Sequence, residues 1–163
     1  MRLAVCAACT ALFVLLQSTV LHVIAFHGVI PDLSLIAVIF IANRNGPVFG
    51  QSAGFIGGLV EDFLSLSPLG FHALLKTVIG FCAGMSFGAV FFGSLFMPML
   101  MAGAASIVKN FMTAILMAII SDSASANIFS WATLIEIVYN MILAPFVFAL
   151  LGFIKILVPK VRG

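Results

Sequence analysis

Long apolar stretches separated by short polar ones make up almost the whole of this 163-residue chain. The intervals between the stretches are rich in Gly, Pro, Asn and Ser, which end helices and form turns. Most of the stretches approach the roughly 20 residues that a helix needs to cross a bilayer. The pattern therefore predicts transmembrane helices at about residues 3–26, 31–43, 48–66, 70–92, 99–121 and 131–155.

The amino-acid composition places these helices in a membrane. Hydrophobic residues make up 64% of the chain and charged residues only 7%, which is too little polar surface for a water-soluble globule. We expect an all-α integral membrane protein in which residues 1–163 form a single transmembrane domain surrounded by the lipid bilayer. The net charge of +2 is scattered along the chain, and no basic patch indicates binding to nucleic acid.

The distribution of Lys and Arg indicates how the helices are oriented. If all six segments cross and the N-terminus is cytoplasmic, every Lys and Arg at or beyond the segment ends lies on the cytoplasmic side, as is typical of short loops. Both termini are then cytoplasmic. The second segment leaves an alternative open, because about 13 residues rise only about 20 Å, so it is short, tilted or re-entrant. The residues behind this orientation are Arg2, Arg44, Lys155, Lys160 and Arg162.

A few charged residues fall inside the predicted helices, and they are the candidate functional residues. Charge in hydrocarbon is costly unless it is paired. The third segment runs outward and the fourth runs inward, so Lys76 lies at nearly the depth of Glu61 and Asp62. We expect Lys76 to contact one of these acids across the hairpin. Because adjacent helical residues point about 100° apart, one acid is expected to face the bundle and the other the outer interface.

The last two segments carry a second polar group. Glu136 and Asn140 are spaced i, i+4 and share a helix face. We expect Lys109 to point at that face, with Asn110 as an auxiliary hydrogen-bonding residue, and Asp32 to lie at the outer surface. The two groups look separate, which favours a structural role or an interface with another membrane protein over a proton relay or a polar ligand pocket.

Glycines recur every fourth residue in the third and fourth predicted helices. In lipid, small residues at this spacing allow two helix backbones to approach closely. We therefore expect these helices to pack tightly at the centre of the bundle, and Pro145 to kink the sixth helix. The glycines are Gly50, Gly54, Gly58, Gly80, Gly84 and Gly88.

Motifs for catalysis and for cofactor binding are missing from the sequence. It contains no GxxxxGK[ST], GxGxxG or HExxH pattern, so nucleotide binding and metalloprotease activity are not indicated. Its two GxSxG matches, at residues 50–54 and 84–88, lie inside predicted apolar helices and not at a strand-to-helix turn, so serine hydrolase activity is not indicated either. His22 and His27 have no Cys or carboxylate at ligand spacing around them, so no metal site is expected. We expect neither enzyme activity nor a cofactor.

Several short motifs occur together between residues 17 and 84. They are Gln17, Pro31-Asp32-Leu33, Gly50, Gly54, Gly58-Leu59-x-x-Asp62, Ser67-Pro68-Leu69-Gly70 and His72-Ala73-Leu74, followed later by Tyr139-Asn140 and Ala144-Pro145. In combination they resemble the rod shape-determining protein MreD family of bacteria. Two residues depart from the family's pattern, namely Leu66 in place of a small residue and Glu61 as a second acid beside Asp62.

The resemblance implies a non-catalytic scaffold of the bacterial inner membrane. Members of the family bind the bitopic protein MreC and, through it, the filament protein MreB, the SEDS glycosyltransferase and the class B penicillin-binding protein of the cell-elongation complex, which maintains rod shape and lateral peptidoglycan synthesis. The family's fold is similar to the six-helix substrate-binding components of energy-coupling-factor vitamin transporters. The alternative function is therefore such a component, with a polar pocket around Glu61, Asp62 and Lys76.

Overall fold

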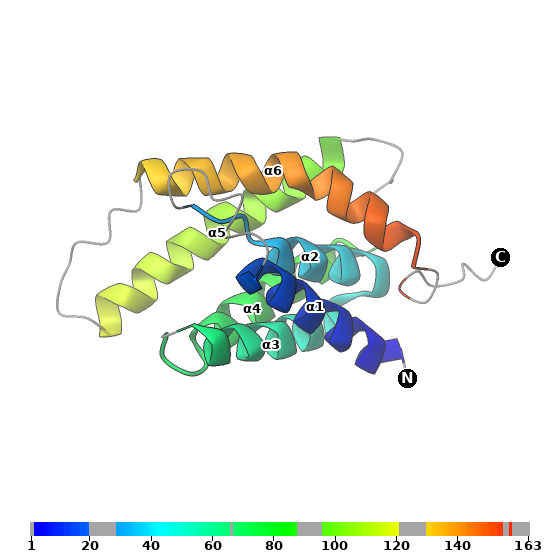
Figure 1. Ribbon diagram of the computed structural model, residues 1–163, viewed down its shortest axis with the longest axis horizontal. Helices are drawn as coiled ribbons and strands as arrows, with labels where there is room; N and C mark the ends of the chain where they lie inside the picture. Colours follow the sequence, from blue (N-terminus) through cyan, green and yellow to red (C-terminus); the bar gives the residue numbers. More distant parts are fainter. Residues whose placement is uncertain are drawn as a thin grey trace.

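The computed structural model describes residues 2–19, 29–65, 67–87, 96–120, 130–154 and 157. Within these residues every regular element is an α-helix, so the prediction of an all-α membrane protein is confirmed (Figure 1). The helices are α1 (Arg2–Thr19), α2 (Leu33–Asn45), α3 (Pro47–Leu64), α4 (Phe71–Met85), α5 (Phe96–Ile120) and α6 (Trp131–Gly152).

Side-chain caps and turn residues explain where α2, α3 and α6 begin. Asp32 caps α2, because its side chain accepts a hydrogen bond from the backbone N–H of Leu35. Gly46 separates α2 from α3 with a φ of 92°, a conformation that glycine adopts without strain. The next residue is Pro47, whose fixed φ suits the first turn of a helix. Ser130 caps α6 in the way that Asp32 caps α2.

The short helix α2 lies at the centre of the molecule. It contacts each of the other helices, and Figure 1 shows it between the α5–α6 pair on one side and the α3–α4 pair on the other. Its residues from Ser34 to Asn43 are all buried. A helix that is apolar on every side is expected where protein surrounds it, which explains why α2 reads as apolar throughout although it has only 13 residues.

The helices α3 and α4 lie in backbone contact along their length. A Cβ atom added to any of five glycines would collide with the opposite helix or with the α2–α3 turn, so no larger residue fits there without a shift of the backbone. This is the close approach that the glycine spacing indicated, and Gly88 lies outside the described residues. The five glycines are Gly50, Gly54, Gly58, Gly80 and Gly84.

Three of the described helices, α1, α5 and α6, are long and apolar enough to cross a membrane, and α2 and α4 are apolar but shorter. The predicted helix ends differ from the observed ones at several points: α5 begins at Phe96 rather than at 99, and α6 ends at Gly152 rather than at 155. Helix α6 continues through Pro145, and its C-terminal half bends away in Figure 1, as expected where proline removes a backbone donor.

Candidate functional site: a buried polar network

Lys76 is completely buried, and three polar side chains surround its ammonium group. Its Nζ atom lies 3.0 Å from Asp32 Oδ1 and also contacts the Glu61 carboxylate and the Ser34 hydroxyl. These partners come from the start of α2 and the last turns of α3, so the lysine of α4 joins three helices. Burial of an ammonium group is tolerated only when partners of this kind replace its water.

Lys109, near the middle of α5, makes the corresponding contacts on the other side of Asp32. Its Nζ atom lies 3.1 Å from Asp32 Oδ2 and also contacts the Glu136 carboxylate of α6. Asp32 therefore bridges the two lysines, with one carboxylate oxygen for each. The prediction of two separate polar groups is wrong: the two lysines belong to one network, and Asp32 is buried at its centre, 3% exposed, rather than at the outer surface.

Neutral polar groups complete the network around Asp32. Its backbone N–H donates to Asn140 Oδ1 at 2.8 Å, and Asn140 Nδ2 donates to Ser106 Oγ at 2.9 Å. The backbone N–H of Ser34 donates to Gln17 Oε1 of α1 at 3.3 Å. Every one of the six helices thus contributes at least one side chain to the network.

Asp62 occupies a different place from its neighbour Glu61. Its carboxylate accepts hydrogen bonds from the backbone N–H groups of Gly70 and His72, both at 2.9 Å, and of Ala73 at 3.2 Å. The Nδ1 atom of His72 also lies 2.9 Å from Asp62 Oδ1. Asp62 therefore closes the hairpin between α3 and α4 by satisfying the first N–H groups of α4.

The structure assigns separate partners to the two acids of this hairpin. Glu61 contacts Lys76 and Asp62 does not, so the predicted contact across the hairpin is made by Glu61. The expectation that one acid faces the outer interface is wrong, because Asp62 is only 3% exposed and the turn between the helices covers it. The reason is the supply of free backbone donors at the start of α4, three of which donate hydrogen bonds to the Asp62 carboxylate.

The second predicted group is present with altered partners. Lys109 contacts Glu136 as expected, but Asn140 binds the backbone of Asp32 and the hydroxyl of Ser106 instead of the lysine. The auxiliary role expected for Asn110 is wrong, since its Nδ2 donates to the carbonyl of Ser106 in its own helix at 2.9 Å.

Charges of opposite sign alternate through the network. The order is Glu61, Lys76, Asp32, Lys109 and Glu136, so each lysine lies between two carboxylates and Asp32 lies between two lysines. Removal of one partner from a buried ion pair costs about 3–5 kcal/mol, because a charge is left without compensation. The arrangement is suited to fixing the positions of helices.

Metal chemistry is not indicated by this arrangement. Among the described residues no group of three or more His, Cys, Asp or Glu is placed to hold a metal ion. The carboxylates at the centre of the network already have lysine partners, and an ammonium group beside a carboxylate opposes the binding of a second cation.

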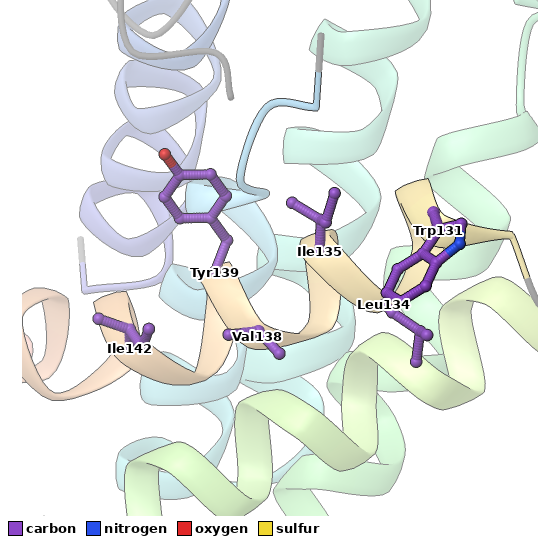
Figure 2. Close-up of a pocket in the computed structure, with 6 residues that line it drawn as sticks. All are labelled: Trp131, Leu134, Ile135, Val138, Tyr139 and Ile142. Atoms are coloured by element: carbon purple, nitrogen blue, oxygen red, sulfur yellow. The ribbon is translucent and has the colours of Figure 1, made fainter. Parts of the chain in front are cut away.

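An apolar groove of about 340 Å³ runs along the opposite side of α6 from the network (Figure 2). In Figure 2 Ile135 and Tyr139 project to one side of the helix, and Leu134 and Val138 to the other. At about 100° per residue, Glu136 and Asn140 point away from this groove. The described residues that line it are Trp131, Leu134, Ile135, Val138, Tyr139 and Ile142.

Comparison with protein families decides what kind of protein carries this network. The model of the family described as rod shape-determining protein MreD matches residues 2–154. The chain belongs to the MreD family. A comparison with curated proteins and another with solved structures each gave no match.

The MreD match covers all six helices and every residue of the polar network. The resemblance drawn from the sequence motifs is therefore confirmed. Membership of this membrane protein family gives the protein a role in determining rod shape, and the family is one of structural proteins.

Proposed function

We propose that this MreD-family protein is a non-catalytic scaffold of the cell-elongation complex in the bacterial cytoplasmic membrane. Its direct partner is an MreC-like bitopic protein, through which it associates with MreB, the SEDS glycosyltransferase and the class B penicillin-binding protein. The observation that carries the proposal is the network that ties side chains of all six helices to the surroundings of Asp32. Such a network fixes one arrangement of helices, which a docking platform requires.

The groove on α6 supports a helix as the docked element. Its lining residues are spaced i, i+3, i+4, i+7, i+8 and i+11 from Trp131 to Ile142, which is the spacing of one continuous helix face. The groove extends over about three turns, or about 16 Å. A single transmembrane helix of the partner fits such a face, because helices associate in lipid through close packing of complementary surfaces.

The network also stabilises this docking surface, through contacts on the opposite side of α6. Lys109 binds Glu136, and Asp32 binds Asn140, on the side of α6 that faces the bundle. These contacts set the rotation of α6 about its own axis and hence the direction of the groove. In this proposal the partner interface depends structurally on six polar residues, namely Glu61, Asp62, Lys76, Lys109, Glu136 and Asn140. The paired glycines keep α3 and α4 packed together and so support the interface.

The orientation proposed for the bundle is six spans with both termini in the cytoplasm. In support, Arg2 Nη2 donates to Asn45 Oδ1 at 3.1 Å, so the start of α1 lies beside the α2–α3 turn that carries Arg44. Basic residues therefore gather at this end, while the acids of the network lie towards the other end of α3. Short cytoplasmic loops are typically basic.

The test is affinity purification of the tagged protein from native membranes, with mass spectrometry of the proteins that come with it. Recovery of an MreC-like bitopic protein is expected. Ile142→Trp fills the groove and is expected to lower that recovery at least about tenfold. The control is Ile107→Trp on α5, since Ile107 is exposed to a similar degree, 58% against 52%, and lies outside the groove.

Two outcomes would contradict the proposal. Equal recovery of the partner with both Trp variants would show that the groove is not part of the interface. Recovery of ATPase subunits and a coupling membrane subunit in place of a bitopic protein would show that the protein is a transport component and not a scaffold.

A further inference from the structure

The two carboxylate oxygens of Glu61 have different surroundings. Oε2 belongs to the polar network, where it contacts Lys76 Nζ and accepts from Ser34 Oγ at 3.4 Å. No group of the network donates to Oε1 in the part of the chain that the structure describes, and the nearest nitrogen of a side chain on that side is His72 Nε2, 3.9 Å away. Only one of the two carboxylate oxygens of Glu61 therefore takes part in the network.

A cavity of about 290 Å³ lies beside Glu61, between the C-terminal end of α1 and the end of α3. Unlike the groove on α6, it has several polar side chains on its wall. Ser65, which lines it, has a buried Oγ atom with no hydrogen-bond partner among the described residues. A cavity with polar groups on its wall is expected to hold water or a polar ligand, because the cavities that stay empty are apolar. The described residues that line it are Val14, Gln17, Ser18, Ile30, Glu61, Leu64 and Ser65.

The charge of the network indicates the sign of the occupant. Three carboxylates, those of Asp32, Glu61 and Glu136, face two ammonium groups, those of Lys76 and Lys109. One negative charge is left over, and none of the described residues on the cavity wall carries a positive one. Excess charge inside an apolar bundle favours an ion of opposite sign next to it.

We propose that this cavity binds an organic cation, a primary ammonium or a guanidinium group, with Glu61 as its counter-ion. The single carboxylate suits a monovalent nitrogen cation, whereas a divalent metal ion needs several oxygen ligands. This site is separate from the α6 groove and does not depend on the scaffold role, so either proposal can fail alone.

Occupancy of the cavity has a consequence for the rest of the bundle. A cation that binds Glu61 competes with Lys76 for the same carboxylate. Lys76 also holds Asp32, and Asp32 holds Lys109. The charged groups are therefore continuous from the cavity to Lys109 of α5.

The experiment measures the reactivity of a cysteine placed on the cavity wall. Ser65→Cys is introduced into the full chain after Cys6, Cys9 and Cys82 have been replaced by Ala. The protein is labelled in detergent with a cationic and with an anionic methanethiosulfonate of similar size. Because one negative charge concentrates cations in the cavity, the cationic reagent is expected to react at least about tenfold faster.

Two comparisons follow from this ratio. Glu61→Gln is expected to bring the two rates within about twofold of each other. Ser52→Cys, on α3 outside the cavity, is the control whose ratio stays unchanged by Glu61→Gln. With Glu61 intact, n-propylammonium chloride is expected to slow the labelling of Ser65→Cys more than sodium chloride of the same concentration, and this measurement does not require the glutamine variant to fold.

Three results would overturn the proposal. They are equal rates for the two reagents with Glu61 intact, equal protection by sodium and n-propylammonium, and no labelling of Ser65→Cys by either reagent, which would show a closed cavity.

A final arm identifies the source of the cation. Slower labelling in bilayers of phosphatidylethanolamine than in bilayers of phosphatidylcholine would assign the cation to the lipid headgroup. Equal labelling in the two bilayers would assign it to a soluble amine or to a basic side chain.

Discussion

Lys109 Nζ lies 3.1 Å from Asp32 Oδ2, although the two residues are 77 positions apart in the chain. This contact joins the start of the central helix α2 to the middle of α5. Without it, Glu61 with Lys76 and Lys109 with Glu136 would be two independent ion pairs. The position of Asp32 between the lysines makes the stability of one pair depend on the other.

Loss of the Lys109 ammonium is expected to destabilise the bundle strongly. Lys109→Met leaves Asp32 and Glu136 without their shared partner and should cost about 3–5 kcal/mol of unfolding free energy. Unfolding in a detergent series, followed by circular dichroism, measures this change.

A second substitution separates charge from packing at this position. Asp32 still contacts Lys76 in the Lys109→Met variant, so Glu136 is the carboxylate left without a lysine. Lys109→Met with Glu136→Gln removes this charge and should recover part of the loss. A double variant as unstable as the sum of both single variants would show that the pair is not coupled.

Substitution of Asp32 is expected to destabilise the protein more than substitution of Glu136. Asp32→Ala removes two lysine contacts and the cap of α2, whereas Glu136→Ala removes one contact of a side chain that is 16% exposed. Loss of the cap alone costs about 1 kcal/mol. Thermal unfolding of both variants in the same detergent should give a clearly lower unfolding midpoint for Asp32→Ala than for Glu136→Ala. Equal midpoints would contradict the central position of Asp32.

The glycine contacts of α3 with α4 give a third prediction. A Cβ at Gly54 meets the backbone of Lys76, which has no room to move, so Gly54→Ala should destabilise the protein by about 1–3 kcal/mol. Gly152→Ala is the matched control, because no atom lies within 4 Å of its added Cβ. Similar stability of the two variants would show that the helices separate easily.

Asp62 is expected to act on the hairpin rather than on the ion pairs. Asp62→Ala leaves three backbone N–H groups without their acceptor and should increase amide hydrogen exchange at residues 70–73, at a cost of about 1–2 kcal/mol. Exchange at the start of α2, where Asp32 supplies the cap, should stay unchanged. Equal acceleration at both places would contradict a local role.

The hydrophobic pattern was sufficient to predict the helices, and α2, α3 and α6 begin at Asp, Gly-Pro or Ser residues that have a local reason to start a helix. Counting residues along a helix gives depth in the bilayer, and this was sufficient to predict a contact of Lys76 with one of the acids Glu61 and Asp62. It was also sufficient to predict that Lys109 points at the helix face that carries Glu136. Both kinds of inference use only neighbouring segments.

The joining of the two ion pairs could not be predicted in the same way. Asp32 precedes the apolar run of α2 and follows Pro31, which is a pattern typical of a helix cap, so its contact with Leu35 had a visible signal. Its contacts with Lys76 and Lys109 depend on how α4 and α5 pack around α2, which the periodicity of the sequence does not record. The pairing of Asp62 with backbone groups was missed because backbone donors leave no trace in the amino-acid sequence.

The place of Asp32 at the centre of the network has a consequence for biosynthesis. Its carboxylate is made 44 residues before Lys76 and 77 residues before Lys109. A growing chain that contains only α1 and α2 therefore carries this acid before its lysine partners exist, and an unpaired acid is expected to stay at the water interface. The α3–α4 hairpin supplies the first counter-charge and the α5–α6 hairpin the second, so we expect Asp32 to become fully paired only after the last hairpin has been made.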